Sequence, residues 1–562
     1  MPLNNVSRPL FAETTTYELQ REQSSSTNCL EPSVQMGASE LPNEILFKIV
    51  KKCLKLIIAN YNFEDWDKCL YSKFCEEINN IRLTSKKFKE ILFYYTPWIL
   101  SKTLLPLKAI LPISYKPSEY VIKWVPQFHA INLSDYNCID IVDVVKKIRE
   151  NKVNLPRIMI RFCYISDTES KEIAKLTQLK VLDLSRNKIG DAGAKEIAKL
   201  THLRVLDLSR NNIGYAGAKE IAKLPKLREL DLSYNNNIGN AEAEEIAKLL
   251  GKVAKLSELR KLTLSGSWIG DAGVQKIAEL SKLRELILSG RSIGDVGAQA
   301  ITKLTQLRVL DLSDCCIGDA GVQKIAELTQ LIVLDLSGNS ISDSGVQKIA
   351  ELRQLRELTL SGRSIGDVGA QAIAKLTQLI VLNLSLSSIG HVGAQAIDKL
   401  SKLRKLNLIR SSIGDEGAQA IAELTELREL NLAWSNIGDV GAQAIAKLTQ
   451  LIVLDLGSNN IGDVGAQAII KLTQLRELVL RENKISFEGV KEIAKLTQLR
   501  ELSLAWINIG YAGAQEIAKL SEIRVLDLRY CNIGDAGAEE IAKLPKLRAS
   551  ILRGNNISVK KK

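Results

Sequence analysis

A segment of 24 residues that recurs along most of the chain constrains its fold more than any other feature. Residues 176–199 read LTQLKVLDLSRNKIGDAGAKEIAK, and residues 200–223 read LTHLRVLDLSRNNIGYAGAKEIAK. A fixed period in this range indicates a solenoid, in which one small supersecondary unit is stacked on its copies. Fifteen such units are predicted between residues 176 and 543.

Each unit contains the pattern of one strand and one short helix. Leu182 and Leu184 alternate with polar or variable neighbours, which predicts a strand with one buried face. Gly193, Ala194 and Ile197 lie three and four residues apart, which predicts a short helix with an apolar stripe. Asp191 stands at the start of this helix, where we expect its carboxylate to cap the first turn of the same helix.

Stacking such units must produce a curve. Neighbouring strands lie about 4.8 Å apart, whereas packed helices need about 8–10 Å. The strand side is therefore shorter than the helix side. The predicted fold class is an α/β solenoid, a curved horseshoe with parallel strands inside and short helices outside.

These residues also carry a family resemblance. The pattern LxxLxLxxNxIG followed by a short helix resembles the leucine-rich repeat, and GAQAIA at residues 369–374 resembles the GALA subtype of the ribonuclease-inhibitor class. The resemblance covers residues 176 to the end, about two-thirds of the chain. It implies a horseshoe that binds another protein.

The N-terminal part has a different pattern. Residues 1–40 are rich in Ser, Thr, Glu and Asn, which predicts a disordered leader. Residues 41–95 are expected to form an all-helical domain, because LPNEI at 41–45 and IRLTSKKF at 81–88 resemble the two halves of an F-box. An insertion near residues 61–66 lengthens the gap between the halves. A plain helical cap on the solenoid is the alternative interpretation.

The F-box resemblance implies a partner. An F-box docks a Skp-type adaptor protein of a cullin–RING ubiquitin ligase. The positions that match the motif, and that would contact the adaptor, are Leu41, Pro42, Ile45, Ile49, Leu83 and Phe88.

The remaining boundaries follow from composition and spacing. Four prolines at residues 96–124 predict a linker, and the solenoid is expected over residues 125–562. Residues 125–151 and 152–175 are predicted as two degenerate first units. Residues 224–255 are eight residues longer than the others, which predicts a bump on the convex side. The last unit begins at residue 544 with Ser550 in place of leucine, which predicts a frayed end.

Composition indicates the cellular compartment and excludes some classes of partner. The nine cysteines form no CxxC pair, which favours free thiols in a reducing compartment. No apolar stretch is long enough for a membrane span, and the net charge of +12 is spread along the repeats as single residues. We therefore expect a cytoplasmic protein without membrane or nucleic-acid partners. The resemblance to GALA-type effectors extends this expectation to the cytoplasm of a host cell after secretion.

The sequence contains no catalytic pattern. The three histidines stand apart from any nucleophile or carboxylate at a useful spacing, so we expect no enzyme activity, no cofactor and no metal. Asp183, Asp207 and Asp231 recur on successive strands, and we expect them to form a solvated row. Cys315 and Cys531 occupy a position that is usually Asn, where we expect a structural role.

Binding is the better candidate for function. The repeats differ most at the positions that face inward from each strand and just after it, where later units carry the residue types enriched in interface hot spots. Neutral drift at exposed positions is the alternative. The candidate target-binding residues are Arg410, Trp434, Arg481, Glu482, Trp506, Arg529 and Tyr530.

Together these features predict a non-enzymatic adaptor, monomeric outside its complex, whose F-box docks a Skp-type protein and whose arc holds an unknown target for ubiquitin transfer. A leucine-rich-repeat scaffold with a helical cap and no role in ubiquitination is the alternative. A third hypothesis, an enzyme regulator similar to ribonuclease inhibitor, differs only in its partner.

Overall fold

The computed structural model describes residues 131–134, 138–235, 258–266, 269–290, 293–362 and 364–558. The chain divides into two units, Met1–Tyr95 and Thr96–Lys562, and every described residue belongs to the second. The expected leader at 1–40, the F-box-like segment at 41–95 and the linker at 96–124 lie outside the described residues.

Strands and short helices alternate along the second unit, as the repeat predicts. The elements are β1 (Ile131–Asn132), α5 (Cys138–Glu150), β2 (Arg157–Met159), α6 (Asp167–Ile173), β3 (Val181–Asp183), α7 (Asp191–Ile197), β4 (Val205–Asp207), α8 (Tyr215–Ile221), β5 (Glu229–Asp231), β6 (Lys261–Thr263), α10 (Asp271–Ile277), β7 (Glu285–Ile287), α11 (Asp295–Ile301), β8 (Val309–Asp311), α12 (Asp319–Ile325), β9 (Val333–Asp335), α13 (Asp343–Ile349), β10 (Glu357–Thr359), α14 (Asp367–Ile373), β11 (Val381–Asn383), α15 (His391–Ile397), β12 (Lys405–Asn407), α16 (Gly414–Ile421), β13 (Glu429–Asn431), α17 (Asp439–Ile445), β14 (Val453–Asp455), α18 (Asp463–Ile469), β15 (Glu477–Val479), α19 (Phe487–Ile493), β16 (Glu501–Ser503), α20 (Gly510–Ile517), β17 (Val525–Asp527), α21 (Gly534–Ala542) and β18 (Ala549–Ile551).

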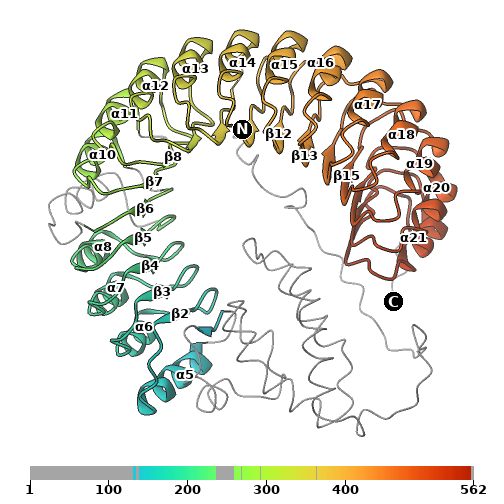
Figure 1. The fold of residues 1–562 in the computed structure, drawn as a ribbon. Coiled ribbons are helices and arrows are strands. Elements are labelled where there is room, and N and C mark those ends of the chain that lie inside the picture. Colours follow the sequence, from blue (N-terminus) through green and yellow to red (C-terminus); the bar gives the residue numbers. More distant parts are fainter. Residues whose placement is uncertain are drawn as a thin grey trace, which may run out of the picture. The chain divides into compact units, whose positions relative to one another are not determined.

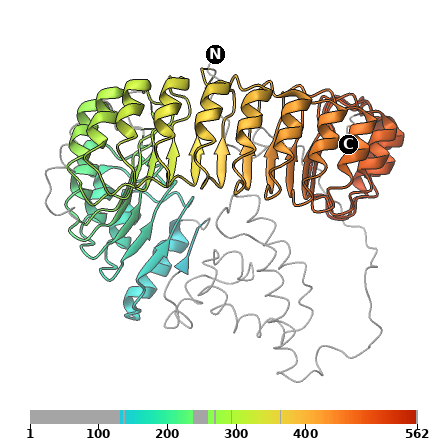
Figure 2. The same ribbon diagram turned by 45° about the horizontal axis from the view of Figure 1, so that its top comes forward.

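The described strands form one parallel sheet of 18 strands, in which each strand pairs with the next in sequence. The register is one repeat long, so Leu182 of β3 pairs with Leu206 of β4. Within this unit the strands lie on the inner side of a curve and the helices on the outer side, as Figures 1 and 2 show. The predicted α/β solenoid is confirmed for the described residues.

The core lies between the sheet and the row of helices. Leu182 of β3, Leu184 just after it, and Ile189, Ala194 and Ile197 from the turn and helix are all 0% exposed. Each fully buried leucine or isoleucine contributes about 1.5–3 kcal/mol relative to an exposed side chain. Because every unit adds the same set, the units share one continuous core. Among the described helices, none is both long and apolar enough to span a lipid bilayer.

The asparagine that recurs in many of the repeats connects neighbouring units through its side chain. The Nδ2 group of Asn187 donates to the carbonyls of Ile160 and Leu184, at 2.7 and 2.8 Å. Its Oδ1 atom accepts from the backbone N–H groups of Cys163 and Ile165, both at 3.0 Å. One amide therefore satisfies buried backbone groups of two successive turns.

Cysteine fills the same position in three of the described repeats, as Cys163, Cys315 and Cys531. The Cys531 thiol donates to the Leu504 carbonyl at 3.2 Å, and the Cys315 thiol donates to the Leu288 carbonyl at 3.5 Å. Burial raises the pKa of these two thiols to about 12. Cys315 and Cys531 are buried and lie within the turn, as a structural role requires.

The predicted capping by aspartate is wrong in one respect. Asp191 does not cap α7, whose N-cap is Gly190 without a side-chain hydrogen bond. Instead, its Oδ1 atom accepts from the backbone N–H groups of Gly214 and Gly217, at 2.7 and 2.8 Å, at the start of α8. The carboxylate points to the neighbouring unit because stacking brings the next helix N-terminus within reach, so the cap joins two units.

The two ends of the solenoid depart from the repeat. Leu155, Ile158 and Ile160 of the second unit are fully buried, and the first unit has the longer helix α5. In the last strand Ser550 is exposed, which fits the predicted frayed end. The expected bump at 224–255 falls largely on residues 236–257, which lie outside the described residues.

Candidate binding surface

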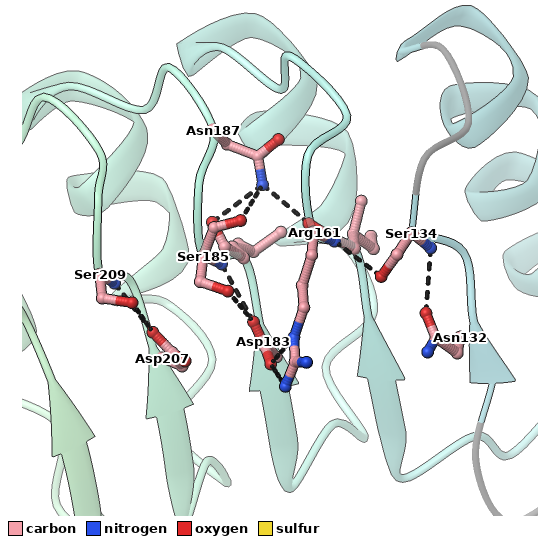
Figure 3. A network of polar contacts seen from close by, with 10 residues as sticks. Asn132, Ser134, Arg161, Asp183, Ser185, Asn187, Asp207 and Ser209 are labelled. Carbon is pink, nitrogen blue, oxygen red and sulfur yellow. Dashed lines mark hydrogen bonds and ion pairs between the residues drawn. The ribbon is translucent and has the colours of Figure 1, made fainter. Parts of the chain in front are cut away.

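A row of aspartates lies on the inner face of three neighbouring strands. Asp183 pairs in register with Asp207, and Asp207 with Asp231. Figure 3 shows Arg161 beside Asp183, with a distance of 2.6 Å between Nη2 and Oδ2. The predicted solvated row is wrong for Asp183, which is 6% exposed because Arg161 and the following serine cover it.

The row is electrostatically unfavourable. Burial, together with the charges of Asp183 and Asp231, raises the pKa of Asp207 to about 7. The Ser209 hydroxyl and backbone N–H donate to Asp207 Oδ1 at 2.7 and 2.9 Å, which opposes the rise. Among the described residues no cluster of three or more His, Cys, Asp or Glu side chains has the arrangement of a metal site.

The third residue after each strand forms a second row, which we call the rim position. Arg410, Trp434, Glu482, Trp506 and Tyr530 occupy the rim positions after β12, β13, β15, β16 and β17. The structure therefore places these predicted residues in one row along the turns. The remaining two predicted residues, Arg481 and Arg529, each precede a rim position by one residue.

Two pairs of side chains on this row contact each other. Trp506 and Tyr530 stack with ring centroids 4.0 Å apart, and the guanidinium carbon of Arg410 lies 5.7 Å from the centre of the Trp434 ring. Trp434, Trp506 and Tyr530 are 46%, 56% and 39% exposed. We call these four residues the C-terminal rim group.

The other three predicted residues form polar contacts with neighbouring side chains of the protein. Arg529 forms two hydrogen bonds with Asp527, from Nε at 2.9 Å and from Nη2 at 2.7 Å. Glu482 accepts a hydrogen bond from the Ser458 hydroxyl at 2.9 Å and lies 3.9 Å from Arg481. These groups are less free to bind a partner than the C-terminal rim group. Arg481 and Glu482 interrupt that group between Trp434 and Trp506.

A second exposed group near the other end was not predicted. Arg186 lies 4.6 Å from the ring of Phe162, and Arg210 lies 4.4 Å from the ring of Tyr234. All four occupy rim positions, and Tyr164 beside them is 69% exposed. The residues are far apart in sequence, so only alignment of the repeats by rim position would have revealed them.

The backbone at the rim position has an uncommon conformation. Trp434, Trp506 and Tyr530 have φ angles of 58°, 65° and 56°, in the left-handed region. Bulky residues rarely adopt it, and each such residue costs about 1–3 kcal/mol. Gly266 and Gly338, in the middle of the solenoid, fill the same position at φ 71° without that cost.

The positions that resemble an F-box lie outside the described residues, so their geometry stays a prediction. These are Leu41, Pro42, Ile45, Ile49, Leu83 and Phe88.

Comparison with known proteins agrees with the repeat. A model described as "Leucine-rich repeat region" matches residues 291–444 and 421–555, and "Leucine rich repeat" matches 153–213 and 177–238. A third, also "Leucine Rich repeat", matches 256–278. Among curated proteins, none matches the chain.

Several solved structures are similar in arrangement. An internalin (inlF) from Listeria monocytogenes is 22% identical, with 68% of this chain and 88% of that chain covered and a TM-score of 0.35. The plant peptide hormone receptor RGFR1 in complex with RGF2 is 17% identical, with 78% and 76% covered and a TM-score of 0.36. The TLR13–ssRNA13 complex is 18% identical, with 78% of each chain covered and a TM-score of 0.42. Alignments at these scores carry no conclusion about ligands.

Proposed function

Since this chain is a leucine-rich repeat protein, we propose that it is a non-enzymatic scaffold that binds a protein partner through its C-terminal rim group. A protein partner would bury the exposed rings of Trp434, Trp506 and Tyr530, together with the guanidinium of Arg410. Trp, Tyr and Arg are the side chains that most often dominate interface energies.

The large exposed rings at the rim position carry this proposal. Under neutral drift, glycine would be the least costly residue in every repeat, because φ near +60° strains any residue with a β-carbon. The C-terminal repeats instead place the largest side chains there, at φ 58° and 65° for the two tryptophans. Asp314, Leu386 and Ser458 have φ angles of 53°, 62° and 55° at the same position, so other repeats share the strain. The exposed aromatic rings distinguish the C-terminal repeats, and binding accounts for them.

The two contacting pairs favour a preorganised surface. The Trp506 and Tyr530 rings support each other at 4.0 Å, so a partner would find them already in place. Rigid aromatic side chains lose little entropy on binding, which is why preorganised surfaces give higher affinity.

A quantitative affinity capture tests the proposal. The full chain and a Trp434→Ala, Trp506→Ala, Tyr530→Ala variant would be used to capture partners from the native extract, and each retained protein would be purified for direct binding measurements. Loss of a hot spot costs at least about 2 kcal/mol, roughly a 30-fold rise in Kd.

Tyr511 supplies the matched control. It is an exposed aromatic residue on helix α20, at 44% exposure, and it does not occupy a rim position. Tyr511→Ala should leave the Kd unchanged. Equal binding by the triple rim variant and the wild type would disprove the assignment of the surface.

A second candidate adds a ubiquitin-ligase role. The segments LPNEI at 41–45 and IRLTSKKF at 81–88 support an F-box that docks a Skp-type adaptor, with the arc holding the target. In that role the protein would act in the cytoplasm, including that of a host cell if it is a secreted effector. A pull-down with a purified Skp-type adaptor tests it, with Leu41→Ala combined with Pro42→Ala as the variant. If the wild type does not bind, the scaffold function stands without this role.

A further inference from the structure

The residue immediately before each strand forms another row, which we call the pre-strand position. Six consecutive repeats carry a basic residue there. The six residues are Lys180, Arg204, Arg228, Arg260, Arg284 and Arg308.

Backbone hydrogen bonds place these residues side by side. The N–H of Arg204 donates to the carbonyl of Lys180 at 2.7 Å, and the same bond, at 2.7–2.8 Å, links every further neighbour along the row. Adjacent strands are about 4.8 Å apart, so the six residues span about 24 Å. Charges that are at least 24 residues apart in sequence therefore form one continuous stripe.

The guanidinium groups of this stripe are not neutralised by the fold. Within the described residues, the side chains of its five arginines form no ion pair and no hydrogen bond. Arg204, Arg260, Arg284 and Arg308 are exposed, and Arg228 is half-buried.

The nearby carboxylates are mostly committed to other cations. Glu258 pairs with Lys282 at 2.7 Å, and Glu285 pairs with Lys261 at 2.9 Å. Among the acidic residues next to the pre-strand position in these repeats, this leaves Glu229 without an ion pair in the described part of the chain. The stripe therefore keeps a net positive charge.

In two later repeats the arginine at this position has a hydrogen-bond partner within the protein. Arg428 donates from Nη1 to the side chain of Gln450 at 2.9 Å, and Arg476 donates to the Gln498 carbonyl at 3.1 Å. Both are half-buried. Arg428 and Arg476 thus have internal partners at this position, whereas the arginines of the stripe from 180 to 308 have none among the described residues.

We propose that this stripe binds the phosphate backbone of a nucleic acid. An evenly spaced row of cations fits a polymer that carries one charge on every unit, as a nucleic acid does. Guanidinium also pairs with phosphate oxygens in bidentate geometry. A protein partner would instead need apolar anchors, and the residues of the stripe offer none.

The contacts would be independent of base sequence. No aromatic side chain occupies the six pre-strand positions, so the stripe itself has no ring on which a base could stack. The surface is distinct from the C-terminal rim group, and this inference does not depend on the proposed protein partner. The expectation against nucleic acid assumed that singly spaced charges stay apart, whereas stacking the repeats collects them.

Binding of the full chain to a labelled poly(U) RNA and to a labelled DNA duplex tests the proposal, by fluorescence anisotropy between about 50 and 200 mM salt. The logarithm of the binding constant should fall linearly with the logarithm of the salt concentration. Combining Arg204→Gln, Arg284→Gln and Arg308→Gln should reduce the slope by about 0.9 for each lost duplex contact, or about 2.7 in total.

A matched variant changes the same position in later repeats. Arg428→Gln, Arg476→Gln and Arg524→Gln remove the same total charge outside the stripe, and the slope should stay close to that of the wild type. Circular dichroism would confirm that both variants fold. Absence of wild-type binding, an equal loss in both variants, or preferential binding of a polyglutamate peptide would each overturn the proposal.

Discussion

The carboxylate of Asp415 accepts a hydrogen bond at 2.6 Å from the backbone N–H of Gly438, which stands 23 residues later at the start of the next helix. The same oxygen accepts the N–H of Gly441 at 3.0 Å. In every described repeat whose preceding helix supplies aspartate in its first turn, the residue 23 positions later donates the same bond, with glycine or serine as the donor.

The repeats without that aspartate show what it controls. His391 stands in its place in α15, and the corresponding glycine of the next repeat, Gly414, has φ +61°. Gly438, which follows Asp415, has φ −103°. Without the carboxylate, the N–H of Gly414 turns to the Ser435 carbonyl at 3.0 Å. The side chain in one unit thus sets the backbone conformation in the next.

Asp415→Ala should lower the free energy of unfolding by about 0.5–2 kcal/mol, because it removes a helix cap. Urea denaturation measures the change, and hydrogen exchange should speed up at the Gly438 and Gly441 amides. Glu423→Ala, an exposed carboxylate just after the same helix, is the control and should have little effect. His391→Asp should act in the opposite direction and protect the Gly414 amide from exchange. An unchanged exchange rate at Gly438 would contradict the capping role.

Stability should fall as pH rises toward neutrality because of Asp207. Its pKa is about 7 in the folded protein, raised by burial and by Asp183 and Asp231, whereas an unfolded aspartate titrates near about 3.9. Between these values the folded state binds more protons, so this contribution to stability is present at low pH and lost as pH rises through about 7. Asp207→Asn should flatten the dependence of Tm on pH in this window. A variant with the same pH profile as the wild type would refute the assignment.

Leu334→Asp should be severely destabilising. Leu334 is 1% exposed, so the change loses about 1.5–3 kcal/mol of burial and adds an unpaired charge in the core. Thermal unfolding followed by circular dichroism measures the effect. Val333→Asp is the control, because the neighbouring side chain is half-buried on the inner face. A comparable loss in both variants would show that Leu334 is not a core residue.

The rim position should reverse the usual ranking of alanine and glycine. Trp434 has φ +58°, where a β-carbon costs about 1–2 kcal/mol. Trp434→Gly should therefore be more stable than Trp434→Ala, as measured by urea denaturation. At Ala192, in the helical backbone of α7, Ala192→Gly should instead destabilise the protein by about 0.5–1 kcal/mol. An alanine variant at 434 that is more stable than the glycine variant would remove the argument for strain.

The sequence predicts features that recur in register with the repeat. Leu182 and Leu184 have the spacing of a buried strand and Ile197 that of a buried helix, and all three lie in the core because these periods report which face is apolar. The exposed position of Trp506 follows in the same way, since the framework positions are already filled.

Features that arise between units were harder to predict. Asp191 caps a helix in the neighbouring unit, and Arg204 joins Arg228 across the sheet, because stacking brings together residues one period apart. Tryptophan as a residue type does not indicate the left-handed backbone at position 506. Only the glycines at the same position in other repeats indicate it. The F-box-like positions, such as Leu41, remain a prediction.

The link from Asp415 to Gly438 also explains how such an array can lengthen. A copied block of 24 residues contains an aspartate that caps the helix of the following block. It also contains the backbone N–H groups that bond to the aspartate of the preceding block. An inserted copy therefore finds compatible neighbours on both sides at once. Residues 424–447 and 448–471 are identical at 16 of 24 positions, including all of 436–445 and 460–469. This similarity fits growth by tandem duplication, in which the number of units changes while every junction stays intact.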